Sequence, residues 1–124
     1  MLKKILLIDE DFDIISLYAP IFNSSEFDLL TGHVGAEGLA TAIGMKPDLI
    51  MLDIKMEGMD GIEVLRQLKS NKITASIPVV MFTNVTDADV IEEAKKLGAI
   101  DYWEKSKVDP KEAYARAKKI LKME

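Results

Sequence analysis

Three short runs of the chain are apolar at every position. They cover residues 5–8, 49–52 and 79–82 and read ILLI, LIML and VVMF. A strand with one face in solvent would alternate apolar and polar side chains, so these continuous runs indicate strands of a parallel sheet that is covered on both faces. Two weaker candidates, Phe27 to Thr31 and Ala99 to Trp103, bring the expected number of strands to five.

Segments with helical periodicity separate the expected strands. They are Phe12 to Phe22, Ala36 to Met45, Gly61 to Leu68, Asp87 to Leu97 and Pro110 to Met123. Asp109 and Pro110 suit the N-cap and the first position of the last helix, and Gly98 suits the end of the helix before it. Pro20 has no N–H to donate, so we expect a kink or an early end in the first helix.

The regular alternation of strand and helix, with short connections, predicts one α/β domain over residues 1–124. Right-handed crossovers then favour an open, doubly wound parallel sheet. Ligands of such sheets bind beyond the carboxyl ends of the strands. That edge of the sheet is where functional side chains are expected.

Composition narrows the class of protein. The chain is 48% hydrophobic and 30% charged, with a formal net charge of −5 and no cysteine. Disulfides and thiolate metal sites are therefore excluded, and direct binding of nucleic acid is not expected. The first apolar run stops after four residues at Asp9, too early for a signal peptide, and no apolar stretch approaches the length of a membrane span. We expect a soluble, cytoplasmic domain.

Polar side chains with complementary chemistry follow the expected strands. Acids at 9–11 follow the first strand, Asp53 the third and Thr83 the fourth, while Lys105 lies two residues past the fifth. In a parallel sheet these ends meet at one edge. Clustered carboxylate oxygens suit a hard cation, Mg²⁺ or Mn²⁺, beside which Asp53 would attack phosphorus. Lys105 would stabilise the transferred oxygens, and Thr83 would sense them.

Four stretches, in chain order, resemble the motifs of response-regulator receiver domains of two-component signalling. They are Ile5 to Asp11, Pro47 to Gly61, Pro78 to Thr83 and Ala94 to Lys105. The similarity covers essentially the whole chain. It implies a CheY-like, flavodoxin-like (βα)5 fold with a five-stranded parallel sheet of order 2-1-3-4-5, in a stand-alone receiver domain over residues 1–124.

The resemblance assigns a role to each strand-end residue. Asp53 would be the phosphoacceptor, with Asp9, Glu10, Asp53 and the backbone carbonyl of Lys55 holding Mg²⁺ or Mn²⁺. The phosphoryl group would come from a sensor histidine kinase or a phosphotransfer protein. Such a domain is not a conventional enzyme, because it catalyses only its own phosphorylation and dephosphorylation.

The resemblance also implies a switch. Thr83 and Lys105 would contact the phosphoryl group, and Tyr102 would turn with Thr83 to alter the surface of the fourth helix, fifth strand and fifth helix. An unidentified downstream protein would bind that surface, with no nucleic acid or membrane involved. The protein would be a monomer or a weak dimer.

Several positions depart from the family's usual residues. Glu10 stands where a second aspartate is usual, which affects metal binding, and Glu57 and Ser106 replace prolines. A cis peptide bond is not favoured before serine. Lys55 and Val85 occupy the positions that flank the path of the hydrolytic water. Because valine cannot orient a water molecule, we expect slow loss of phosphate.

Two other functions are compatible with parts of the pattern. A degenerate receiver would keep the fold and bind a protein partner without being phosphorylated. A phosphatase of the haloacid-dehalogenase type also uses an aspartate after an apolar strand, but it needs a second aspartate two residues later. Here that position, 55, is lysine, which argues against a phosphatase.

Overall fold

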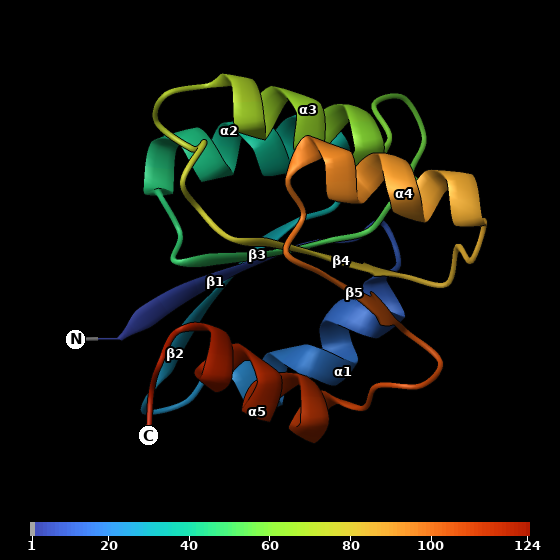
Figure 1. Cartoon of the computed structure of the whole chain (residues 1–124). Coiled ribbons are helices and arrows are strands. Elements are labelled where there is room, and N and C mark those ends of the chain that lie inside the picture. The colour runs from blue at the N-terminus through green and yellow to red at the C-terminus, as the bar shows by residue number, and fades with distance from the viewer. Residues whose placement is uncertain (1) are drawn as a thin grey trace.

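The computed structural model describes residues 2–124 as a five-stranded parallel sheet with five helices (Figure 1). In chain order the elements are β1 (Lys3–Ile8), α1 (Phe12–Phe22), β2 (Phe27–Gly32), α2 (Gly35–Met45), β3 (Leu49–Leu52), α3 (Gly61–Ser70), β4 (Val79–Thr83), α4 (Ala88–Leu97), β5 (Asp101–Glu104) and α5 (Pro110–Ile120).

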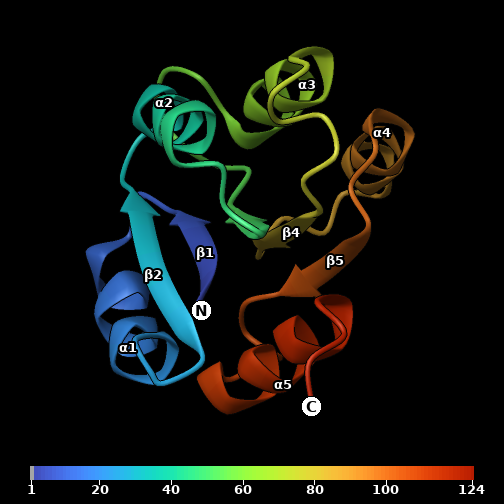
Figure 2. The same ribbon diagram turned by 90° about the vertical axis from the view of Figure 1, so that its left-hand side faces the viewer.

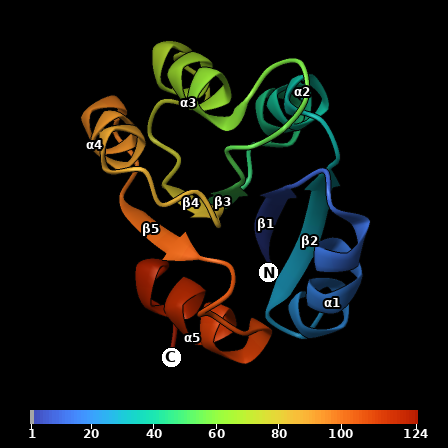
Figure 3. The ribbon, with the colours of Figure 1, turned by 90° about the vertical axis from the view of Figure 1, so that its right-hand side faces the viewer.

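The strands lie in the order β2-β1-β3-β4-β5 and all neighbours are parallel, as expected for a doubly wound sheet. Helices α2, α3 and α4 cover one face, and α1 and α5 cover the other; the views along the two ends of the molecule separate these layers (Figures 2 and 3). The predicted fold class and strand order are confirmed.

The two layers explain why the central strands are apolar at every position. In β1, Leu6 and Ile8 pack into the core beneath α2, α3 and α4, whereas Ile5 and Leu7 pack into the core beneath α1 and α5. All four side chains are buried. A strand that contributes to two cores has no polar face, and this produces the continuous apolar runs in the sequence.

Some element bounds differ from the expectations. β4 includes Thr83, and β5 ends at Glu104, so Lys105 directly follows its strand instead of lying two residues beyond it. α5 ends at Ile120, three residues before the expected Met123. Its end is fixed by Lys122, which has a left-handed φ of 56°, and by a hydrogen bond from the N–H of Met123 to the carbonyl of Lys118.

Of the two effects expected at Pro20, a kink or an early end, the early end does not occur. The helix continues to Phe22, and the N–H of Asn23 still bonds to the carbonyl of Ala19. Because Pro20 lies in the last turn, it removes only one intrahelical hydrogen bond. The predicted caps at Gly98 and Asp109 are present. No helix within residues 2–124 is long and apolar enough to cross a membrane.

Candidate functional site

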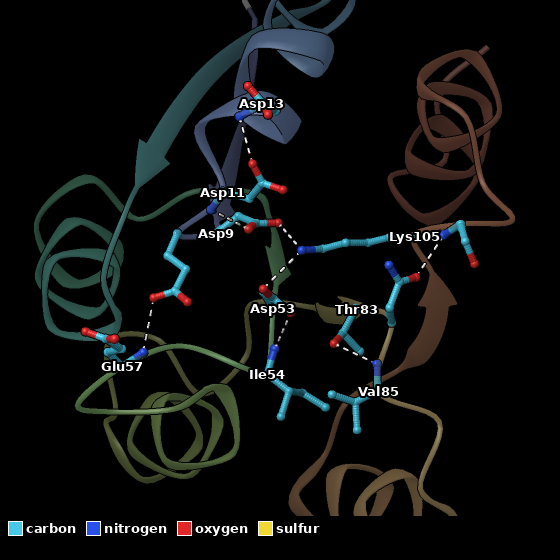
Figure 4. A network of polar contacts seen from close by, with 12 residues as sticks. Asp9, Asp11, Asp13, Asp53, Ile54, Glu57, Thr83, Val85 and Lys105 are labelled. Atoms are coloured by element: carbon cyan, nitrogen blue, oxygen red, sulfur yellow. Dashed lines mark hydrogen bonds and ion pairs between the residues drawn. The ribbon is translucent and has the colours of Figure 1, made fainter.

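A cavity of about 430 Å³ opens at the carboxyl edge of the sheet. It is lined by Asp9, Glu10, Asp11, Asp53, Lys55, Thr83, Asn84, Val85 and Lys105. The register of the strands explains this gathering, because Ile8 pairs with Leu52 and Thr83 pairs with Glu104. The residues that follow these strands therefore meet although they are far apart in sequence (Figure 4).

Lys105 lies between two buried carboxylates. Its Nζ is 2.5 Å from Asp9 Oδ2 and 3.0 Å from Asp53 Oδ2. The side chain of Asp9 is 0% exposed and those of Asp53 and Lys105 are 8% and 10% exposed. One ammonium group thus contacts both carboxylates and can balance only one of their two negative charges.

Burial and charge act in opposite directions on these groups. Burial raises the pKa of Asp9, and the hydrogen bonds from Lys105 and the N–H of Asp11 only partly offset it. For Lys105, burial disfavours the ammonium form, but the hydrogen bond to Asp9 and the charge of Asp53 outweigh this cost, so its pKa is raised. The lysine is therefore charged at neutral pH.

The backbone fixes the position of Asp53. Its N–H donates to the carbonyl of Ile8, and its Oδ1 accepts a hydrogen bond from the N–H of Ile54 at 2.8 Å. Gly61, at the start of α3, packs so closely that an added Cβ would lie 2.0 Å from the carbonyl oxygen of Asp53. A side chain at position 61 would displace the strand end that carries Asp53.

Glu10 and Asp11 line the same cavity, but their carboxylates bond to backbone N–H groups and not to Lys105. Glu10 Oε2 accepts a hydrogen bond from the N–H of Glu57 at 3.1 Å, and Asp11 caps α1 by accepting from the N–H of Asp13 at 2.9 Å. Lys55 lines the cavity. Within residues 2–124 no three histidine, cysteine or acidic side chains form a cluster that could hold a metal ion. Asp9 and Asp53 are brought together, and Glu10 is turned toward the loop after β3.

Thr83 and Tyr102 are linked through the loop that follows β4. The N–H of Val85 donates to Thr83 Oγ1 at 3.2 Å, and the hydroxyl of Tyr102 donates to the carbonyl of Val85. Tyr102 is half-buried, and the negative charge of Asp53 and burial both raise its pKa, with burial the larger cause. One loop residue thus contacts both side chains that were expected to form a switch.

A family model described as the response regulator receiver domain matches residues 5–118. The chain belongs to this family. The receiver domain is 35% identical to sporulation initiation phosphotransferase F of Bacillus subtilis over 105 residues, which is 85% of this chain and 83% of that protein. Two-component signalling is therefore the setting in which the site acts.

Longer regulators and solved structures are also similar. The receiver domain is 38% identical over 122 residues to the alkaline phosphatase synthesis transcriptional regulatory protein PhoP of Bacillus subtilis, covering 98% of this chain and 50% of that protein. It thus spans about half the length of such regulators. A CheY-like receiver domain protein from Methanospirillum hungatei is 25% identical with a TM-score of 0.90, covering 98% of this chain and 95% of that one.

The sequence did not reveal the role of Asn84. Its Oδ1 accepts a hydrogen bond from the N–H of Ser106 at 2.9 Å, which ties the loop after β4 to the residue after Lys105. The peptide bond between Lys105 and Ser106 is trans, as expected before serine. Ser106 has the N–H that a proline would lack, and nothing in the sequence indicates which side chain accepts from it.

Proposed function

We propose that Asp53 accepts a phosphoryl group, in a reaction that depends on Mg²⁺ or Mn²⁺, from a sensor histidine kinase or a phosphotransfer protein. The observation that carries this proposal is the convergence of Asp9, Asp53 and Lys105, joined at 2.5 and 3.0 Å in a cavity open to solvent. Membership of the receiver family supports it.

The donor set suits a hard divalent cation. The carboxylates of Asp9 and Asp53 already share one cation, the Lys105 ammonium, and carboxylate oxygens are the ligands that Mg²⁺ prefers. Asp9, Glu10, Asp53 and the carbonyl of Lys55 would hold the metal. When bound, it would supply positive charge to the oxygens of the incoming phosphoryl group.

The protein's own residues then carry the transfer. A carboxylate oxygen of Asp53 forms a bond to phosphorus while the bond from phosphorus to the donor's imidazole nitrogen breaks, and the imidazole leaves as the neutral ring after taking up a proton. Lys105 moves from Asp53 to a phosphoryl oxygen and balances its charge. Phosphorylation thereby converts the contacts of Lys105 from carboxylates to phosphate.

Thr83 would relay the change. Its Oγ1 accepts from Val85 and retains a hydroxyl hydrogen for a phosphoryl oxygen. A shift of Thr83 would pull on Val85, whose carbonyl accepts from Tyr102. Because Tyr102 lies on β5, the proposed readout is a change in the surface formed by α4, β5 and α5, where an unidentified downstream protein would bind.

Acetyl phosphate provides a direct test. The protein is incubated with Mg²⁺ and acetyl phosphate, and intact mass spectrometry measures the addition of one phosphoryl group. We expect the adduct in the parent and in Asp28→Asn, a matched change at an exposed aspartate on β2. We expect none in Asp53→Asn or in the presence of EDTA.

The same experiment distinguishes the alternatives. Absence of the adduct in the parent would favour a phosphorylation-independent binding module over the proposed phosphoacceptor. Steady release of phosphate from added phosphomonoesters would instead indicate a phosphatase.

A further inference from the structure

The side chain of Glu10 bridges two loops at the mouth of the cavity. Glu10 follows β1, and its Oε2 accepts from the N–H of Glu57, which lies 47 residues later in the loop between β3 and α3. The bond length is 3.1 Å, and both residues are exposed. Glu57 contributes only its backbone to this contact, so the bond does not depend on the chemistry of its side chain.

This contact takes Glu10 out of the acidic centre. Asp9 and Asp53 meet at Lys105, but no cluster of three metal-ligating side chains is present in residues 2–124. The carboxylate that would complete such a cluster is the one held by the Glu57 amide. The effect is one of position, because a carboxylate that accepts one N–H keeps other lone pairs free. While Oε2 is bonded to the Glu57 amide, the Glu10 carboxylate lies outside the contact between Asp9, Lys105 and Asp53.

We propose that the backbone amide of Glu57 restrains Glu10 away from the cation position, so that the residue at position 57 sets the affinity of the cavity for Mg²⁺. This inference rests on the proposed function, because it concerns the cation that phosphorylation requires. The longer side chain of glutamate permits the restraint; an aspartate at position 10 would be one methylene shorter and would reach the loop less well.

The local backbone offers a clean way to remove the restraint. Gly58 has a positive φ of 75°, whereas Glu57 is not among the residues with positive φ, so the negative φ of a proline is not excluded at position 57. Glu57→Pro deletes the N–H donor, and Glu57→Ala deletes the same side-chain charge while keeping the donor.

The test compares Mg²⁺ binding by these two variants, measured by titration calorimetry without any phosphodonor. We expect Glu57→Pro to bind Mg²⁺ about fivefold more tightly than Glu57→Ala, the effect of releasing one modest hydrogen bond to a charged acceptor. In a Glu10→Ala background the ratio between the two variants is expected to fall to one, since the restrained group is gone.

A second measurement uses the parent protein and does not depend on how the proline variant folds. In amide NMR spectra the Glu57 proton is expected to shift upfield as Mg²⁺ saturates the protein, toward its position in metal-free Glu10→Ala. A Glu57 resonance that keeps its metal-free position at saturation overturns the inference, as does equal affinity of Glu57→Pro and Glu57→Ala.

These failures are distinct from failure of the proposed function. If Mg²⁺ binds and Asp53 is phosphorylated but position 57 has no influence, only the restraint is wrong. If no variant binds Mg²⁺, the restraint is overturned together with the metal dependence, and the acetyl phosphate experiment then decides whether Asp53 accepts phosphate at all.

Discussion

Replacing Lys105 by methionine tests whether the lysine holds the two buried carboxylates together. Methionine keeps most of the apolar stem and removes the charged Nζ, which lies 5.8 Å from the centroid of the Phe82 ring. At an effective dielectric constant of about 20, two unit charges 3.0 Å apart attract by roughly 5 to 6 kcal/mol. Desolvation cancels much of this gain, and removal of one partner from a buried pair typically costs about 3 kcal/mol.

Lys105→Met should therefore lower the free energy of unfolding by about 3 kcal/mol at pH 7 in EDTA. Urea unfolding followed by the fluorescence of the buried Trp103 measures this loss. Lys107→Met is the matched control, because Lys107 is 75% exposed and lies 3.9 Å from Glu104. We expect that control to change stability by less than about 0.5 kcal/mol.

Metal and pH give the prediction two further checks. Saturating Mg²⁺ should restore more stability to Lys105→Met than to the parent, since no ammonium then competes for Asp9 and Asp53. Burial already raises the pKa of Asp9 in the folded state, and without lysine it rises further above the unfolded value. The neutral form of Asp9 therefore stabilises the folded state at low pH, and this benefit is lost as pH rises through the folded pKa, so the deficit should grow as pH rises through that range. A loss no larger than that of Lys107→Met would refute the reasoning.

Three other predictions follow from the contacts near the site. Burial raises the pKa of Tyr18 to about 12, so the free energy of unfolding, measured by urea titration, should fall by roughly 2 to 3 kcal/mol between pH 10 and pH 12. Tyr18→Phe should flatten that fall, and it should cost about 1 kcal/mol of stability at pH 8 because the Val108 carbonyl loses its hydrogen-bond donor. Val85→Glu should speed loss of phosphate from the phosphorylated protein by roughly fivefold, because the glutamate can form one hydrogen bond to the attacking water. Intact mass spectrometry measures the half-life, and an unchanged half-life would contradict the idea that valine makes the phosphorylated state long-lived. Asn84→Ala should slow phosphorylation by acetyl phosphate by about threefold by freeing the N–H of Ser106, while lowering stability by less than about 1 kcal/mol; an unaltered rate would show that this bond does not aim Lys105.

The fold could be predicted because its signals are local and repeated. The central strands β1, β3 and β4 are recognisable because their residues are apolar on both faces of the sheet. Helix ends are recognisable where a short side chain or a glycine caps them, as at Asp109 and Gly98. The misjudged ends had competing determinants. Lys122 adopts a left-handed backbone that nothing in its side chain requires, and one proline in the last turn of α1 costs too little to stop that helix.

The site was predictable only as far as topology determines it. A parallel sheet brings strand ends to one edge, so Asp9, Asp53, Thr83 and Lys105 were expected to be neighbours and are. The direction in which Glu10 turns was not predictable. It depends on an acceptor meeting the N–H of a residue 47 positions away, and every residue except proline carries such a donor.

The two positions where prolines are usual in the family therefore share a physical consequence. Glu57 and Ser106 each present an N–H at the mouth of the cavity, and each N–H is taken by a side chain that lines it, Glu10 in one case and Asn84 in the other. One bond draws an acid away from the acidic centre, and the other braces the loop beside Lys105. The Glu57 amide and Lys105 thus contact carboxylates that the proposed metal site would use. Phosphorylation by the proposed route then has to exchange these contacts for contacts to metal and phosphate, and the free energy of that exchange is what residues 57 and 106 would adjust.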